Sequence, residues 1–349
     1  MMEKVIKVGI IGYGLSGRYF FAPFINYHEG FQLFAVCSSQ TEAISSDYPD
    51  AVIYKQPDEL LGSGDVDLII IASPNHTHYD YARKAILAGK HVVVEKPFTI
   101  TSDEARELIE LSEQYKVVLA PFHNRRWDGD FMTVKKIIEE GQLGEILDFE
   151  SHFDRYRPMY ERAPWKNEAI NGNGVLYDLG PHLIDQALVL FGLPEALYAN
   201  IRVQRIDGVI DDNFEIQLFY PQTKVVLKAG AIVREPGPRF SVHGRLGSFI
   251  KYGLDPQEEQ LKNGLTPASE ELGADSEQLY GLMHTEINGV VVRQKVETLQ
   301  GKYIEYFDNV YKAISKKEPL AVNPNHALQV IQIIEKAYQS NIAKRIINL

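Results

Sequence analysis

The chain has 349 residues, a length that predicts about two domains of ordinary size. Its composition, 45% hydrophobic and 24% charged, is that of a globular protein and excludes the disordered, collagen-like and coiled-coil classes. The formal net charge of −11 leaves no positive field to attract nucleic acid or an anionic membrane, so we expect neither as a partner.

Cysteine content and apolar runs restrict the class further. The single cysteine, Cys37, excludes an intrachain disulfide framework and a zinc site built from four thiolates. No apolar run reaches the roughly 18 residues that a membrane span needs, and the N-terminal residues lack the pattern of a signal peptide. We therefore expect a soluble protein of the reducing cytoplasm.

The first third of the chain alternates short apolar runs with helical patterns. Strands are predicted over residues 5–11, 33–37, 51–54, 66–72, 91–94 and 117–122. One helix is predicted at about residues 77–88, before Gly89, and another at about 102–115, where Thr101 and Glu104 have the spacing of a capping box. This alternation predicts βαβ units and a doubly wound parallel sheet, which is an α/β fold.

The pattern changes after Asn124. Helices are predicted at about residues 131–140, 179–190 and 326–343, and strands over 145–156, 196–206, 213–220, 224–233 and 240–252; residues 255–277 are polar and predict a loop. Consecutive strands with short connections indicate an open, mainly antiparallel sheet with helices on one side, an α+β arrangement. We predict a first domain over residues 1–124 and a second over 125–349, with the final helix a candidate to pack back on the first domain.

A glycine-rich turn follows the first predicted strand directly. Its residues are Gly12, Tyr13, Gly14, Leu15, Ser16 and Gly17, which match the pattern G-x-G-x-x-G. The glycines allow a tight turn, close approach of backbone N–H groups to a pyrophosphate, and close packing of the next helix on the strand. In this context the motif predicts a dinucleotide-binding Rossmann domain in which these six residues contact the cofactor.

The choice of cofactor depends on the end of the second strand, where a carboxylate would bind the ribose 2′-OH of NAD. The residues there are Ser38, Ser39, Gln40 and Thr41, and the first carboxylate is Glu42. Hydroxyl groups can donate hydrogen bonds to a 2′-phosphate, so we predict NADP, with NAD as the alternative, and contacts from Ser38, Ser39 and Thr41. Arg18, just after the glycine turn, is a candidate to supply a positive charge.

Polar residues also follow the fourth and fifth strands, whose carboxyl ends face the cofactor crevice of a doubly wound sheet. We predict cofactor contacts from these two segments, specifically from Ser73, Pro74, Asn75, His78, Glu95 and Lys96. Lys96 would stand beside the nicotinamide, which favours a functional role over that of a solvated surface lysine. His76 and His78 have the spacing of metal ligands, but no carboxylate or thiolate accompanies them, so we expect no metal.

Asp178 and His182 stand four residues apart at the start of a predicted helix, and therefore on one face of it. A carboxylate beside an imidazole suits proton transfer, because the negative charge fixes the ring and supports its protonated form. The spacing is equally consistent with a helix cap at Asp178 and a structural histidine at position 182.

These motifs together resemble the glucose-fructose oxidoreductase and inositol dehydrogenase family, called Gfo/Idh/MocA, over essentially the whole chain. The resemblance is carried by the glycine turn, by Glu95-Lys96-Pro97 and by Asp178-x-x-x-His182. The segments 123–128, 155–158 and 177–180 resemble most closely the NADP-dependent scyllo-inositol dehydrogenase branch. An arginine commonly follows the second strand in that branch, whereas this sequence has Gln40 in that region.

The resemblance implies nicotinamide-dependent oxidation of a secondary alcohol on a cyclic polyol or sugar, or the reverse reduction of a ketone. It also implies that Lys96, Asp178 and His182 form the catalytic set. His182 would accept the hydroxyl proton, Lys96 would stabilise the developing alkoxide, and Asp178 would orient His182 or accept a neighbouring hydroxyl. Asp178 and His182 would thereby also bind the substrate.

Further residues complete the predicted site. Trp165 is a candidate to pack against the nicotinamide, and Asn124 and Arg155 are candidates to bind substrate hydroxyls. The alternatives are the same chemistry on an aldose, an amino-sugar or another carbonyl substrate, and a non-catalytic regulator that senses NADP and a sugar. Apolar residues at alternating positions, Phe214, Ile216 and Leu218, suggest an exposed sheet face that forms a homodimer or homotetramer.

Overall fold

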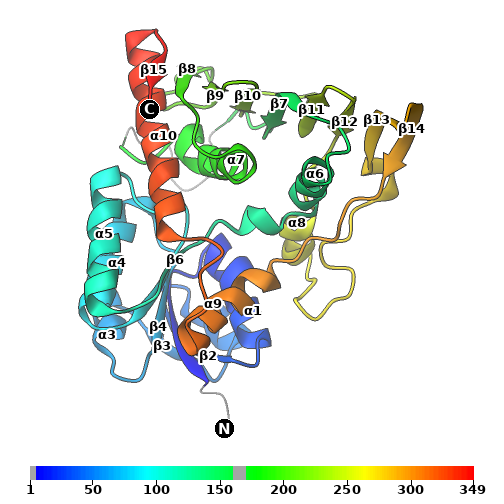
Figure 1. The fold of residues 1–349 in the computed structure, drawn as a ribbon. Helices are drawn as coiled ribbons and strands as arrows, with labels where there is room; N and C mark the ends of the chain where they lie inside the picture. Colours follow the sequence, from blue (N-terminus) through cyan, green and yellow to red (C-terminus); the bar gives the residue numbers. More distant parts are fainter. Residues whose placement is uncertain (1–4, 160–169) are drawn as a thin grey trace. The chain divides into compact units, whose positions relative to one another are not determined.

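The computed structural model describes residues 5–159 and 170–349 (Figure 1). The chain forms two compact units, and each is assembled from separated segments. Unit 1 contains Met1–Asn124, Gln257–Leu272 and Lys302–Ile331, and unit 2 contains Arg125–Pro256, Gly273–Gly301 and Gln332–Leu349. Within the described residues, no helix is long and apolar enough to cross a membrane.

Unit 1 is built on a six-stranded parallel sheet with the order β3-β2-β1-β4-β5-β6. Its strands are β1 (Ile6–Ile11), β2 (Phe31–Cys37), β3 (Val52–Tyr54), β4 (Leu68–Ile71), β5 (His91–Val94) and β6 (Leu119–Pro121). The order reverses between β1 and β4, where doubly wound sheets bind nucleotides. All six strands predicted for this part of the chain are present, so the α/β prediction is confirmed.

Helices cover this sheet because its central strand is apolar on both faces. All four residues of β4 are fully buried, as expected of a strand between two helical layers. The helical segments of unit 1 are η1 (Ser16–Phe21), α1 (Ala22–Tyr27), α2 (Thr41–Asp47), α3 (Pro57–Gly62), η2 (Asn75–Thr77), α4 (His78–Leu87), α5 (Ser102–Tyr115), α8 (Gln257–Lys262) and α9 (Ile304–Lys316). The predicted capping box is present, since Thr101 and Glu104 each accept a hydrogen bond from the other's backbone N–H.

Helix α9 belongs to unit 1 although it follows most of the second half in sequence. Phe307 stacks on Phe24 of α1 with ring centroids 5.0 Å apart, and Tyr306 packs edge-on against Phe122. We did not predict this helix, although its apolar residues recur at helical spacing. It packs in unit 1 because the free energy gained by burying these aromatic rings exceeds the entropic cost of bringing together segments that are distant along the chain.

Unit 2 contains a nine-stranded sheet with the order β14-β13-β12-β11-β7-β10-β9-β8-β15. Its strands are β7 (Ile146–His152), β8 (Ala196–Arg202), β9 (Asn213–Phe219), β10 (Lys224–Gly230), β11 (Phe240–Gly244), β12 (Gly247–Lys251), β13 (Gly281–Ile287), β14 (Val290–Val296) and β15 (Ile347–Asn348). Strands β7 and β10 pair in parallel and all other neighbours are antiparallel, which confirms the open, mainly antiparallel sheet.

Two strand predictions for unit 2 need correction. The single strand predicted over residues 240–252 is a hairpin of β11 and β12, because the chain reverses at Arg245 and Leu246. The hairpin of β13 and β14 was not predicted, although Asn288-Gly289 is a strong turn signal. Both residues have positive φ angles, 51° and 79°, as a tight turn of this type requires.

The helices of unit 2 lie on one face of its sheet, where Figure 1 shows α6 (Gly129–Glu139) and α7 (Val175–Phe191). Phe214, Ile216 and Leu218 are buried on this covered face, with 1%, 0% and 0% of their surface exposed. Our prediction that they form an exposed face was therefore wrong. Alternate residues such as Glu215 of β9 and Lys228 of β10 are partly exposed and lie on the open face.

The final helix, α10 (Pro324–Ala343), contributes to both units. Ala327 is fully buried in the apolar core of unit 1. In unit 2, Tyr338 donates a hydrogen bond to Asp211, and the Ser340 hydroxyl accepts one from the backbone N–H of Ala199. Two short 3₁₀ segments, η3 (Asn124–Trp127) and η5 (Glu277–Leu279), complete the described elements.

Candidate active site

Each glycine of the turn after β1 meets a different steric demand. Gly12 has φ +100°, and a Cβ there would lie 2.4 Å from the carbonyl oxygen of Ala72. A Cβ at Gly17 would lie 2.1 Å from the carbonyl oxygen of Gly12. Only glycine therefore allows the following helix to pack this closely on the turn. A Cβ at Gly14 would meet nothing within 4 Å. The space above Gly14 is therefore open for close approach of a pyrophosphate.

The other residues of the turn connect it to neighbouring strands. The Ser16 hydroxyl donates a hydrogen bond to the Glu95 carboxylate, 3.1 Å away, which ties the turn to the end of β5. Tyr13 is buried, with 1% of its surface exposed, whereas Leu15 is exposed. Of the residues predicted here, Ser16 and Leu15 have side chains that can approach a ligand, while Tyr13 offers its backbone.

The segment after β2 is tied to the same turn. The Gln40 side-chain amide donates a hydrogen bond to the carbonyl oxygen of Tyr13, 2.9 Å away. The Ser38 hydroxyl accepts from the Gln40 N–H at 3.2 Å, while Ser39 is exposed and Thr41 is partly exposed. The structure thus brings the glycine turn and the predicted ribose-binding residues together in unit 1.

His78 connects the segments after β4 and β5. Its Nδ1 lies 2.7 Å from the carbonyl oxygen of Pro97, and its Nε2 lies 2.9 Å from that of Ser73. The ring is fully buried, and burial lowers the pKa of His78, opposed by the two backbone hydrogen bonds. The neutral ring has one N–H and can donate it to only one of these two carbonyl oxygens, so His78 lies packed between the two loops and is not exposed to a ligand. Ser73, Pro74 and Asn75 beside it are partly exposed.

Lys96 stands where β5 ends. It is partly exposed between buried Glu95 and Pro97, and the peptide bond between Lys96 and Pro97 is cis. Glu95 accepts a hydrogen bond from Ser16 of the glycine turn, and the carbonyl oxygen of Pro97 lies within hydrogen-bond distance of His78. Both neighbours of Lys96 in the chain thus contact other loops at the carboxyl edge of the sheet. Its backbone is therefore held at the carboxyl end of the parallel sheet, as the sequence predicted.

In unit 2, Asp178 and His182 lie in the first two turns of α7. The helix begins after Gly174, whose φ of +95° lets the chain turn sharply into it. Asp178 is therefore inside the helix, and its backbone N–H donates to the carbonyl oxygen of Gly174 at 2.9 Å. The side chain of Asp178 is 31% exposed, whereas His182 is buried, with 5% exposed.

Arg155 approaches Asp178 from the chain that continues β7. One of its terminal nitrogens lies 3.6 Å from the Asp178 carboxylate, and its guanidinium lies over the ring of Phe153, 4.8 Å from the centroid. The positive charge of Arg155 thus lies next to the predicted catalytic carboxylate of Asp178. Asn124, the other predicted substrate ligand, is buried as the last residue of the first segment of unit 1. Trp165 lies outside the described residues.

Several residues that position α7 were missed by sequence reasoning. Asp211, just before β9, accepts hydrogen bonds from the backbone N–H of Leu176 and from the Tyr338 hydroxyl, both at 2.8 Å. It thereby satisfies an N–H group that a helix N-terminus leaves without an intrahelical partner. Burial raises the pKa of Asp211, opposed by these hydrogen bonds. The sequence feature that could have indicated this role is the acidic pair at positions 211 and 212, directly before a predicted strand.

Buried ion pairs fix the next turn of the same helix. Arg126 binds Asp185 with two hydrogen bonds of 2.8 and 2.6 Å, one turn beyond His182. Arg239 donates to the side chain of Gln186 at 2.8 Å and also contacts Asp130 of α6 at 3.4 Å. Burial lowers the pKa of Arg239, opposed by the charge of Asp130. These contacts lock the rotation of α7, and with it the direction of Asp178 and His182.

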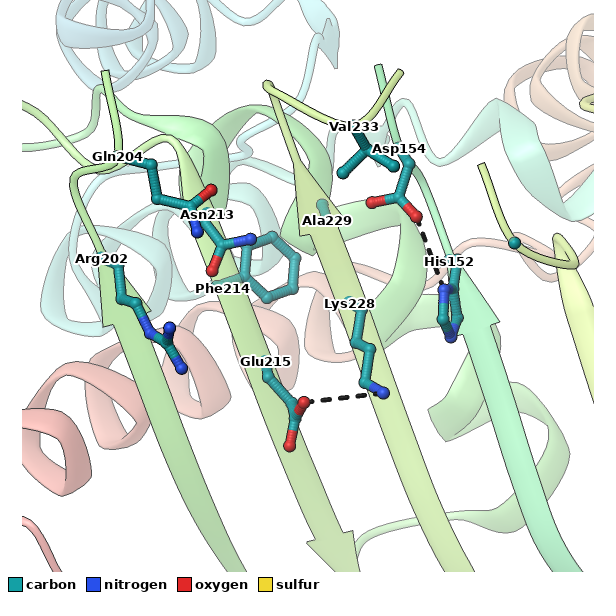
Figure 2. Close-up of a pocket in the computed structure, with 11 residues that line it drawn as sticks. His152, Asp154, Arg202, Gln204, Asn213, Phe214, Glu215, Lys228, Ala229 and Val233 are labelled. Atoms are coloured by element: carbon teal, nitrogen blue, oxygen red, sulfur yellow. Dashed lines mark ion pairs between the residues drawn. The ribbon is translucent and has the colours of Figure 1, made fainter. Parts of the chain in front are cut away.

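A pocket of about 400 Å³ lies on the open face of the second sheet and contains none of the predicted site residues (Figure 2). His152 lines it 3.5 Å from the Asp154 carboxylate, and Lys228 lines it and forms an ion pair with Glu215 at 3.6 Å. His152 and Asp154 line the pocket, whereas Phe153 and Arg155, which alternate with them along the chain, contact each other near α7. In the described part of the chain, no group of three or more His, Cys, Asp or Glu side chains is arranged to hold a metal ion.

Comparison with protein families assigns both halves of the chain. Residues 6–123 match the NAD-binding Rossmann fold of the Gfo/Idh/MocA oxidoreductases, and residues 135–349 match the C-terminal alpha/beta domain of the same family. The chain belongs to the Gfo/Idh/MocA family of oxidoreductases. It is therefore an enzyme with an NAD-binding Rossmann domain, as the motifs indicated.

Individual relatives cover the chain to different extents. It is 39% identical over 344 residues to scyllo-inositol 2-dehydrogenase (NADP(+)) of Bacillus subtilis, covering 99% of this chain and 96% of that protein. The solved structure of yvaA from Bacillus subtilis superimposes with a TM-score of 0.97 at 38% identity, covering 100% of this chain and 99% of the other. D-glucoside 3-dehydrogenase of Escherichia coli is 29% identical over 203 residues, 57% of this chain and 58% of that protein.

Proposed function

We propose that the protein is an NADP-dependent dehydrogenase of a cyclic polyol, with scyllo-inositol as the substrate. The observation that carries this proposal is the match to an NADP-dependent scyllo-inositol 2-dehydrogenase over almost the full length of both chains. The nucleotide-binding turn of unit 1 and the Asp178–His182 face of unit 2 support the same chemistry. The product is the corresponding ketone, and the reverse reaction reduces that ketone.

The proton of the reacting hydroxyl goes to His182 in this proposal. An imidazole suits this role because it exchanges a proton near neutral pH. Asp178 orients the substrate or the histidine, and Arg155, 3.6 Å from Asp178, holds that carboxylate and offers further donors to substrate hydroxyls. The buried pairs beyond His182 keep the helix from rotating, so the base is preorganised.

Lys96 stabilises the negative charge that develops on the substrate oxygen. A fixed ammonium group lowers the barrier because it needs no reorganisation when the charge appears. The cofactor, when bound, would supply the acceptor for the hydride that leaves the carbon bearing this oxygen. We propose Lys96, Asp178 and His182 as the catalytic set.

The cofactor is held by residues of unit 1. We propose backbone contacts to its pyrophosphate from the glycine turn and hydroxyl contacts to its ribose end from Ser38, Ser39 and Thr41. Ser73, Pro74, Asn75 and Glu95 would border the nicotinamide half, and Trp165 is proposed to pack on that ring. Asn124 is proposed to bind a substrate hydroxyl.

An assay with the purified protein tests the proposal. Nicotinamide absorbance is followed with NADP and NAD against scyllo-inositol, myo-inositol and several aldoses. Turnover of scyllo-inositol with NADP, abolished in Lys96→Ala, supports cofactor, substrate class and catalytic lysine together. Turnover of an aldose or amino-sugar alone would keep the chemistry and reject the substrate. Tight NADP binding without any turnover would favour a sensor of NADP and a sugar.

Assembly and location belong to the same proposal. We propose a homodimer or homotetramer in which the open face of the second sheet, with its mixed charges, contacts a second copy (Figure 2). Light scattering of the purified protein measures the mass and tests this, since a monomeric mass would contradict it. The buried free thiol of Cys37 fits the reducing cytoplasm, where we place the enzyme.

A further inference from the structure

Four side chains form a cluster beside the glycine turn, within unit 1. The carboxylate oxygen Oδ2 of Asp47, at the end of α2, accepts a hydrogen bond from the Tyr13 hydroxyl at 2.8 Å. The same oxygen lies 3.1 Å from Nε of Arg18. The side chain of Gln40 reaches the backbone of Tyr13 from the other direction, at 2.9 Å. The cluster therefore connects the turn, the segment after β2 and the end of α2.

Arg18 is held by one edge of its guanidinium group. Its Nε faces Asp47, and its side chain is 41% exposed. Within residues 5–159 and 170–349, the two terminal nitrogens of Arg18 form no hydrogen bond to the protein. Their N–H groups form a planar fork that matches the oxygens of a phosphate. The charge is thus fixed in place while its binding edge stays available.

The position of this fork indicates which phosphate it would take. The ribose 2′ position of a dinucleotide lies at the end of the second strand of such a domain. Residues 38–41, which directly follow this strand, contain no carboxylate to accept a ribose 2′-OH, and Ser38 and Ser39 offer hydroxyls. The Gln40 bond to Tyr13 draws this segment against the turn that carries the Arg18 cluster. One cation and two hydroxyls therefore border the same region.

We propose that Arg18, positioned by Asp47, binds the 2′-phosphate of NADP and sets the preference for NADP over NAD. The inference rests on the proposed function only in requiring that the protein binds a nicotinamide dinucleotide. Asp47 has two opposing effects. It holds the guanidinium in place, and its negative charge disfavours a dianionic phosphate nearby. Asp47→Asn keeps an acceptor for Arg18 and Tyr13 but removes the charge.

The test measures equilibrium binding by titration calorimetry, without turnover. The ligands are NADPH and NADH, and the fragments 2′,5′-ADP and 5′-AMP; within each pair the two compounds differ only in the 2′-phosphate. The variants are Arg18→Gln, Asp47→Asn and a matched control, Arg83→Gln. Arg83 is also an exposed arginine of unit 1 whose Nε contacts a carboxylate, that of Glu107 at 2.9 Å.

Arg18→Gln is expected to raise the dissociation constants of NADPH and 2′,5′-ADP about 10- to 100-fold, as loss of a charge-assisted hydrogen bond does. The constants for NADH and 5′-AMP should change by less than about threefold, which also shows that the variant is folded. Asp47→Asn is expected to tighten NADPH binding about 3- to 10-fold and to leave NADH unchanged. Arg83→Gln should change none of them.

Three outcomes would overturn the inference. Arg18→Gln without effect on NADPH, or with equal loss of NADPH and NADH, would show that Arg18 does not meet the 2′-phosphate. Weaker NADH binding in Asp47→Asn would show that Asp47 accepts the ribose 2′-OH of NAD. Failure of the proposed function gives a different result: without cofactor binding the wild-type protein would bind neither NADPH nor NADH, and a wrong substrate assignment alone would leave all of these binding constants unchanged.

Discussion

His78 and Pro97 meet at 2.7 Å, imidazole nitrogen to carbonyl oxygen, in the interior of the nucleotide-binding unit. The other ring nitrogen lies 2.9 Å from the carbonyl oxygen of Ser73, so one buried histidine lies between the loops that follow β4 and β5 and can donate its single neutral-form N–H to either. Lys96 directly precedes Pro97. The backbone next to the proposed catalytic lysine therefore contacts a residue that is itself inaccessible to substrate.

Acid should weaken the fold through His78. Burial lowers its pKa below 6.5, so the unfolded chain takes up a proton at that site more readily than the folded chain as the pH falls through 6.5. The stability that neutral His78 contributes is present above pH 6.5 and decreases below it. Urea unfolding at pH 7 and pH 5 measures this loss. In His78→Gln, which costs about 1–3 kcal/mol at pH 7, the loss should be smaller. An equal loss in wild type and variant would contradict the assignment.

Substitutions in the glycine turn should separate binding from folding. Gly14→Ala adds a methyl group into open space, so the free protein should keep its melting temperature while NADPH binding weakens at least about tenfold. Gly17→Ala places a methyl group against the Gly12 carbonyl and should destabilise the free protein by about 1–3 kcal/mol. Gly62→Ala, where a Cβ also meets nothing within 4 Å, serves as the control. Normal NADPH binding by Gly14→Ala would place the pyrophosphate elsewhere.

Lys96 should matter for turnover more than for cofactor affinity. Lys96→Met keeps most of the aliphatic stem and removes the charge that stabilises the developing alkoxide, so kcat should fall about 10²- to 10³-fold. The dissociation constant of NADPH should change by less than about threefold, because the pyrophosphate and ribose contacts are untouched. Steady-state kinetics and NADPH titration check the two values. A large loss of NADPH affinity with little change in kcat would assign Lys96 to cofactor binding alone.

Asp211 should support α7 without contacting substrate. Asp211→Ala leaves the Leu176 N–H and the Tyr338 hydroxyl without their acceptor, and should lower the free energy of unfolding by about 1–3 kcal/mol. Tyr338→Phe removes only one donor of that carboxylate and should cost less. Denaturant unfolding of both variants measures the difference. Equal stability of Asp211→Ala and wild type would show that the helix start is fixed by other contacts.

The fold of the first unit was readable from local patterns. Each parallel strand is a short apolar run followed by a turn residue or helix, and the glycine turn marks its nucleotide edge. The β13–β14 hairpin was missed because its outer strand is largely exposed and its apolar run of three valines is short and followed by polar residues. Helix α9 was missed as a member of unit 1 because its partners, such as Phe24, lie about 280 residues earlier.

The candidate site was readable only where its residues are neighbours in sequence. Asp178 and His182 share a helical face by spacing alone. Arg126 and Asp185 are 59 residues apart, and Gln186 and Arg239 are 53 apart. Such pairs depend on the packing of α7 against the sheet and on the register of β7 with β11, which local patterns do not determine. The positioning of the proposed base was therefore invisible in the sequence.

The central claim, that His182 acts as the base in NADP-dependent oxidation of scyllo-inositol, is most directly tested by following the absorbance of the nicotinamide. Purified wild-type protein is mixed with NADP and scyllo-inositol, and the rise at 340 nm is compared with that of His182→Gln. The account predicts NADPH formation by the wild type and a rate about 10²- to 10⁴-fold lower in the variant. Equal rates in the two proteins, or no NADPH formed by the wild type while NADP binds tightly, would contradict it.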